Sequence, residues 1–192
     1  MIKFTIYLLL LFVSLACKST GSNNTEEQTI ESVQQDSIGP PVTENTAPDY
    51  IQLNLNEGVK GVNSYELVDF AKTLIGVPYL YASTDPSKGF DCSGFITHVF
   101  NHFNIAVPRS SKDFTNVGKE VDIPAAKEGD LILFTGTVDS IRIVGHMGIV
   151  TENADTLKFI HSSSGKANGV TISSLNEHYK KRFLKITRVL AE

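Results

Sequence analysis

Residue types that together can perform nucleophilic catalysis occur in the second half of the chain: the thiol of Cys92 and the imidazoles of His146 and His161. Cys92 directly precedes an apolar stripe of helical period, so it is predicted to lie in the first turn of a helix. Free N–H groups at a helix N-terminus favour a thiolate, and we therefore expect a partly activated nucleophile that needs a base. The alternative is a small buried hydrophobe, the common fate of a free cysteine.

The base is expected to come from a later strand. His146 lies between two glycines in an apolar run, residues 144–150, and His161 closes the next predicted strand. Consecutive antiparallel strands are usually neighbours, so the two imidazoles can lie side by side. One would then act as the base and the other would fix its tautomer. The alternative is a pair of unrelated strand-end histidines.

The remaining histidines are assigned no chemistry. His98 and His102 are four residues apart on a predicted helix, a spacing that can bind a metal ion. No Asp, Glu or Cys at matching spacing completes such a site, so partly exposed helix residues are the favoured interpretation. His178, which precedes a basic run, is interpreted as a surface residue. The sequence therefore predicts neither a metal ion nor a cofactor.

The elements that must position these residues indicate an α+β fold, with helices first and an antiparallel meander afterwards. The first helix is predicted from Ser64, as its N-cap, to Leu74, with Gly76 as its stop. The apolar stripe after Cys92 continues at helical period to Phe103. The strand-like runs are residues 131–134, 141–150, 157–161 and 183–190.

The composition excludes several classes of protein. The chain has 192 residues, 41% of them hydrophobic, which is enough for a folded core of one domain. Its 17 basic and 21 acidic residues leave no electrostatic footprint for nucleic acid. Two cysteines exclude a disulfide-rich scaffold.

The N-terminal quarter of the chain is predicted to hold a targeting signal and a tether. Residues 1–16 have one lysine, a short apolar run and a small residue before Cys17, as in the signal peptide and lipobox of bacterial lipoproteins, although Ser14 departs from that pattern. We expect lipidation of Cys17 and hence a membrane anchor. The segment 17–49 is polar and acidic and is predicted to be a disordered tether, whereas residues 50–192 form the domain.

Six runs, taken in order, resemble the NlpC family of bacterial cell-wall cysteine peptidases, and the likeness covers roughly residues 64–189. These runs are Ala71–Tyr79, Gly89–Phe95, Val107–Ser111, Glu128–Phe134, Gly145–Val150 and Phe159–Ser162.

The resemblance implies a papain-like α+β fold with Cys92 as nucleophile, His146 as base and His161 orienting that base. It implies hydrolysis of amide bonds in peptidoglycan stem peptides, with the bond between D-γ-glutamyl and a diamino acid favoured. The expected setting is extracytoplasmic, as a monomer anchored to a bacterial membrane, the outer membrane being favoured. An acyl- or amide-transferring enzyme of the same fold and a catalytically idle wall-binding lipoprotein are the alternatives.

The resemblance further places Tyr79, Asp91 and Ser93 around a pocket for the free amino end of the peptide. Tyr79 is expected to help hold the oxyanion, with the backbone N–H of Cys92 as the main donor. From the residue types alone, Asp91 and Ser93 could equally be helix caps and Tyr79 a packing residue. Arg109 is interpreted as structural.

Two departures from the family pattern border the expected groove. The family has Trp-Gly-Gly shortly after the position of Tyr79, where this chain reads Tyr81-Ala82-Ser83. The stretch Gly136–Val144 is also longer than a minimal link between strands. Both departures concern substrate preference and leave the expected chemistry unchanged.

Overall fold

A computed structural model of the chain describes residues 59–138 and 140–191. The predicted signal segment, Cys17, the predicted tether and residues 50–58 lie outside this range. Within it, no helix combines the length and the apolar character that a membrane crossing requires.

The helices of the domain are short. They are α1 (Ser64–Thr73), α2 (Cys92–His102) and α3 (Glu177–Arg182), with two 3₁₀ helices, η1 (Ser111–Asn116) and η2 (Ile123–Ala125). The cap of α1 is Asn63, whose side-chain oxygen accepts a hydrogen bond from the Tyr65 N–H at 2.8 Å. The prediction of Ser64 as the cap was therefore wrong by one residue, since Asn is as good an N-cap as Ser.

An antiparallel sheet forms the other half of the fold. Its strands are β3 (Lys119–Val121), β4 (Leu131–Thr135), β5 (Val144–Asn153), β6 (Leu157–Ser163), β7 (Gly169–Ser174) and β8 (Phe183–Arg188), in the spatial order β3-β8-β4-β5-β6-β7. A separate small hairpin pairs β1 (Thr84–Asp85) with β2 (Gly89–Phe90). The predicted meander is confirmed for β4 to β6 and extends into β7, but β8 returns to pair with β4 and β3.

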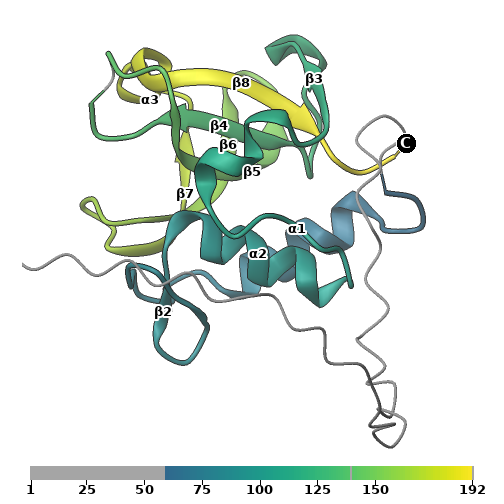
Figure 1. Cartoon of the computed structure of the whole chain (residues 1–192). Coiled ribbons are helices and arrows are strands. Elements are labelled where there is room, and N and C mark those ends of the chain that lie inside the picture. The colour runs from purple at the N-terminus through teal and green to yellow at the C-terminus, as the bar shows by residue number, and fades with distance from the viewer. Residues whose placement is uncertain (1–58, 139, 192) are drawn as a thin grey trace, which may run out of the picture. The chain divides into compact units, whose positions relative to one another are not determined.

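The centre of the sheet is buried on both faces, as the five buried residues of β4 illustrate. Leu131 and Leu133 belong to the core between the sheet and the helices α1 and α2. The alternate residues Ile132 and Phe134 belong to a second core on the other face. Figure 1 shows α1 and α2 together below the sheet and α3 beside β8. Because α2 packs on the sheet, its first residue is held at a fixed place near β5.

The beginning and the end of the described chain meet. Val59 forms a parallel bridge to Leu190, and its N–H donates to the Val189 carbonyl at 2.8 Å. The domain is therefore already folded at its first described residue.

Candidate active site

Cys92 is the first residue of α2, as predicted. The helix is capped by Asp91, whose Oδ1 accepts a hydrogen bond from the Gly94 N–H at 2.6 Å. Gly94 permits the close approach of the β1 hairpin, because a Cβ at this position would lie 2.0 Å from the Ser83 carbonyl oxygen. The start of the helix is therefore fixed by both its cap and its neighbour.

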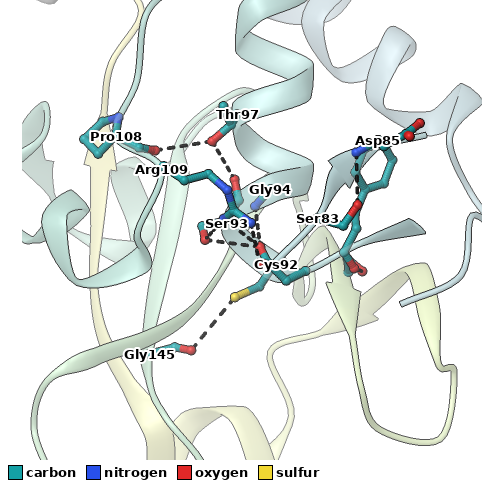
Figure 2. Close-up of polar contacts among 12 residues, drawn as sticks. Ser83, Asp85, Cys92, Ser93, Gly94, Thr97, Pro108, Arg109 and Gly145 are labelled. Atoms are coloured by element: carbon teal, nitrogen blue, oxygen red, sulfur yellow. Dashed lines mark hydrogen bonds and ion pairs between the residues drawn. The ribbon is translucent and has the colours of Figure 1, made fainter. Parts of the chain in front are cut away.

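The Asp91 carboxylate is also paired with Arg109. Nη2 donates to Oδ2 at 2.6 Å and Nη1 donates to Oδ1 at 3.0 Å, while Nη1 also donates to Ser93 Oγ at 3.0 Å. Both residues before and after the cysteine are buried, and Figure 2 shows Arg109 reaching this cluster. Asp91 and Ser93 thus adopt the capping arrangement, in which Asp91 is already neutralised, and not one that presents a free carboxylate to an ammonium group.

The two predicted histidines lie side by side on β5 and β6. His146 Nε2 and His161 Nδ1 are 2.9 Å apart, and the rings meet edge to face. His146 is partly exposed and His161 is fully buried. The pairing of strands that are consecutive in sequence explains why their closeness could be predicted.

Cys92 and the histidine pair share one pocket of about 840 Å³, which Tyr79 also lines. The Cys92 Sγ points to the carbonyl of Gly145, the residue before His146, at 3.9 Å (Figure 2). The N-terminus of α2 and the start of β5 therefore deliver the thiol and the imidazole to the same cavity. Tyr79 is held there by its N–H, which donates to the Asn168 carbonyl at 3.0 Å.

Burial, followed by the charge of Asp91, raises the pKa of the Cys92 thiol to about 11. The backbone N–H groups of Ser93 and Cys92, and the charge of Arg109, act in the opposite direction. The backbone N–H groups at the helix start thus favour the thiolate as expected, but burial and the charge of Asp91 outweigh them. The desolvation of a buried charge outweighs a few partial charges, so the resting group is the thiol.

Both histidines are held neutral. Burial, followed by the charge of Arg182, lowers the pKa of His161 to about 4. Burial, followed by the charge of His161 and then that of Arg182, places the pKa of His146 well below its ordinary value. Near neutral pH each ring therefore has one protonated nitrogen and one acceptor nitrogen.

The pocket is cationic. Lys166 and Arg182 line it, and none of the described residues that line it is Asp or Glu. Arg182 is anchored by a donation from Nη2 to the Thr135 carbonyl at 2.9 Å. A ligand with free carboxylates would suit such a lining better than a cationic one.

Two further pocket residues were not found from the sequence. Ser173 on β7 places its Oγ 2.9 Å from His161 Nε2, and the hydroxyl of Tyr179 on α3 lies 3.4 Å from the same nitrogen. Neither β7 nor α3 was predicted. The alternation of Val170, Ile172 and their polar neighbours was the signal that could have revealed the strand.

The other histidines pack as helix residues. The His102 ring stacks on Phe70 with centroids 3.7 Å apart, and His98 lies 5.0 Å from the Phe90 ring. In the described part of the chain, no group of three or more His, Cys, Asp or Glu side chains is arranged to hold a metal ion.

Comparison with known proteins accounts for this combination of fold and residues. Residues 76–189, more than half of the chain, match the model of the NlpC/P60 family. The chain belongs to the NlpC/P60 family. In a Bacillus cereus NlpC/P60 family protein of known structure, 42% of the chain superposes on 69% of this one with a TM-score of 0.61 and 28% identity. The expected papain-like α+β fold is confirmed.

Two curated relatives have established names. The gamma-DL-glutamyl hydrolase of Bacillus subtilis is 38% identical over 116 residues, which are 60% of this chain and 26% of the relative. The murein DD-endopeptidase MepS/murein LD-carboxypeptidase of Escherichia coli is 39% identical over 107 residues, 54% of this chain and 52% of the relative. The matched region thus spans about half or less of these relatives.

Proposed function

We propose that this protein is a cysteine peptidase that hydrolyses amide bonds in the stem peptides of peptidoglycan. The observation that supports this most is the 2.9 Å contact between His146 and His161 in the pocket that Cys92 lines. A thiol, an imidazole and a second group that orients the imidazole are the parts that acyl transfer through a thioester requires.

The contacts suggest the route of the protons. His146 Nε2 faces His161, so Nδ1 is the ring nitrogen left to take the thiol proton. Cys92 Sγ attacks the amide carbonyl as that proton moves, and the oxyanion is held by the Cys92 N–H with the Tyr79 hydroxyl. The imidazolium then protonates the departing amine as the C–N bond breaks. Water, deprotonated by His146, hydrolyses the thioester and the proton returns to the thiol.

The cationic lining favours a substrate with free carboxylates. A γ-linked D-glutamyl residue keeps its α-carboxylate free, and a diamino acid that has two carboxyl groups adds another. The bond between these two residues is therefore the one we propose, and the name of the Bacillus subtilis relative also specifies a γ-glutamyl bond. Asp91 and Ser93 are assigned a supporting role at the start of α2, because Arg109 occupies the carboxylate. Asp91 and Ser93 are therefore not proposed to bind the free amino end of the substrate peptide.

The site of action is proposed from the N-terminal sequence. Residues 1–16 would direct export, Cys17 would carry the lipid, and residues 17–49 would connect it to the domain at 50–192. The protein would then act on the wall while anchored to a bacterial membrane. Metabolic labelling with a clickable fatty acid tests the anchor, since Cys17→Ala should remove the label.

Three variants test the chemistry. Cys92→Ala and His146→Ala should each lower hydrolysis of purified muropeptides by on the order of a thousandfold or more, because nucleophile or base is lost. His161→Ala should leave measurable activity, because only the alignment of His146 is disturbed. His102→Ala is the matched control, since this exposed residue at the C-terminal end of α2 does not line the pocket. Mass spectrometry of the products is the measurement.

The same experiment separates the alternatives. Full turnover by Cys92→Ala would contradict the peptidase, and binding of muropeptides without any turnover by the unaltered protein would favour the idle wall-binding protein. An added amine acceptor identifies a transferase, because the acyl group would then appear on the amine in preference to water.

A further inference from the structure

The buried nitrogen of His161 on the side away from His146 has its own partner. His161 Nε2 lies 2.9 Å from Ser173 Oγ. On the paired strands β6 and β7, His161 is opposite Thr171 and Phe159 is opposite Ser173. Ser173 is therefore the diagonal neighbour of His161 on the same face of the sheet, a position that a ring can reach.

The direction of each hydrogen bond follows from the role of the base. If His146 Nδ1 is to accept the thiol proton, the proton of the neutral ring must be on Nε2, which then donates to His161 Nδ1. His161 must in turn carry its own proton on Nε2. That N–H is buried and requires an acceptor. The thiol of Cys92, the Nε2–H of His146 and the Nε2–H of His161 are then successive donors, and the last of them needs a hydroxyl as its acceptor.

We propose that Ser173 is a positioning residue of the active site. Its Oγ accepts the Nε2–H of His161 and so selects the tautomers of both histidines, which leaves His146 Nδ1 unprotonated in the pocket that Cys92 also lines. This inference rests on the proposed peptidase function and adds a fourth residue to Cys92, His146 and His161.

Tyr179 is the competing partner. Its hydroxyl lies 3.4 Å from the same nitrogen, which is longer than the Ser173 contact by half an ångström. The Tyr179 ring packs against Phe159 and Phe134, with centroids 4.9 and 5.2 Å apart, so its position is set by the core. A phenol that donated to Nε2 would impose the opposite tautomers, with the proton of His146 on Nδ1. That arrangement would disable the base.

The two hydroxyls can be separated by substitution. Ser173→Ala removes the better acceptor and leaves Tyr179, so a share of the molecules should adopt the opposite tautomers. We expect roughly a tenfold loss of kcat with little change in KM, the size of effect that one net hydrogen bond gives. Ser173→Thr keeps a hydroxyl and should restore most of the activity. Tyr179→Phe keeps the ring, removes the phenol and should leave the tautomers of both histidines unchanged.

The decisive measurement is the ¹⁵N NMR spectrum of the imidazoles in the full chain. In the unaltered protein and in Ser173→Thr, His161 should be protonated on Nε2 and His146 on Nε2. In Ser173→Ala both assignments should shift toward Nδ1. Unshifted spectra in Ser173→Ala, or a shift in Tyr179→Phe in its place, would overturn the proposal.

The kinetics test the peptidase function and the NMR spectra test the role of Ser173, so the two claims can be contradicted separately. If the unaltered protein hydrolyses no muropeptide while the tautomers still depend on Ser173, the peptidase function is wrong and the hydrogen-bond chain stands. If the protein is an active peptidase and Ser173→Ala changes neither tautomers nor kcat, only the role of Ser173 is wrong. A thermal melt of each variant shows whether the fold is retained.

Discussion

At the scale of single residues, Cys92 and the two side chains beside it set the reactivity of the site. Asp91 caps α2 and thereby fixes the cysteine, but its charge also raises the pKa of the thiol. Arg109 partly offsets that charge through its paired hydrogen bonds to Asp91. In the proposed mechanism the nucleophile is consequently a thiol from which a neutral His146 draws a proton during attack, and not a preformed ion pair.

The alkylation rate of Cys92 tests this resting state. With a pKa of about 11, far less thiolate is present near neutral pH than in a free cysteine of pKa about 8.5. The greater nucleophilicity of a more basic thiolate offsets part of the difference. Iodoacetamide should therefore modify the folded protein on the order of 10- to 100-fold more slowly than free cysteine at pH 7.5.

A matched pair of variants sharpens this test. Arg109→Gln removes the cation that lowers the thiol pKa and should slow alkylation further, whereas Lys112→Gln alters a nearby exposed cation outside the cluster and should not. An alkylation midpoint at or below about pH 8.5 would mean that His146 and the helix prevail over burial.

Ala82 is held in a left-handed backbone conformation with φ of 59°. This conformation costs an L-residue roughly 1–2 kcal/mol, which glycine does not pay, and explains why Gly is usual where this chain has Ala. Ala82→Gly should raise the free energy of unfolding by about 0.5–1 kcal/mol, measured by urea titration. Ala154→Gly is the control, because this exposed turn residue has no positive φ and should be destabilised. A loss of stability in Ala82→Gly would contradict the strain.

At the scale of elements, the sequence predicted whatever depends on strong periodicity or on strands adjacent in the chain. The stripe of α2 and the pairing of β5 with β6 are of this kind, so Cys92 and the histidine pair were correctly placed together in one pocket. α3 is only six residues long and has no buried position, so it gave no signal, whereas the alternation in the half-polar β7 is short and was missed. The return of β8 to β4 is a long-range pairing that no local pattern encodes.

The effect of burial on the pKa of the Cys92 thiol could not be predicted either, because it also depends on contacts between segments that are distant in the sequence. The helix start of Cys92 was visible in the sequence, but the depth at which the thiol lies and the charge of Asp91 beside it depend on the packing of distant segments. The pKa of the thiol is therefore raised, whereas the sequence had predicted that it would be lowered. Ser173 was missed because its strand was missed.

The histidine pair between β5 and β6 should make the fold sensitive to acid. The folded-state pKa of His161 is about 4, below the value of about 6.5 in an unfolded chain. The unfolded state therefore binds more protons, so this stability is complete above pH 6.5 and is lost as the pH falls toward 4. Full loss corresponds to about 3 kcal/mol for His161, with His146 acting in the same direction.

Denaturant titrations at pH 7 and pH 4.5 measure this effect. His161→Asn has no proton to bind, so it should lose less stability on acidification than the unaltered protein does. His178→Asn is the control, because this side chain is exposed. If His161→Asn and the unaltered protein lost equal stability between the two pH values, the histidine would not be held neutral by the fold.

At the scale of the whole molecule, charge is distributed unevenly. The chain carries a formal net charge of −4, and the acidic excess lies in residues 18–49. The pocket, in contrast, presents Lys166 and Arg182 and no carboxylate from the described residues that line it. Such a lining should attract anionic ligands to the pocket.

Lys166 is the pocket cation best suited to a test of this idea. It is exposed on the loop between β6 and β7, and none of its contacts within the described residues is an ion pair. Lys166→Gln should raise KM about two- to fivefold for peptides with free carboxylates and leave kcat unchanged, because an exposed pair contributes at most about 1 kcal/mol. Steady-state kinetics on defined stem peptides provide the measurement.

The substrate and the salt concentration each supply a control for Lys166. Peptides whose carboxylates are amidated should show no difference between Lys166→Gln and the unaltered protein, because the partner of the lysine is then absent. At about 0.5 M salt the difference should also shrink, since the screening length falls to only a few ångströms. Lys119→Gln, on β3 at the opposite edge of the sheet from β7, removes the same net charge far from the pocket and should leave KM unchanged. An equal rise of KM in both variants would assign the effect to the net charge of the molecule, and an equal rise on amidated peptides would assign it to packing of the lysine stem.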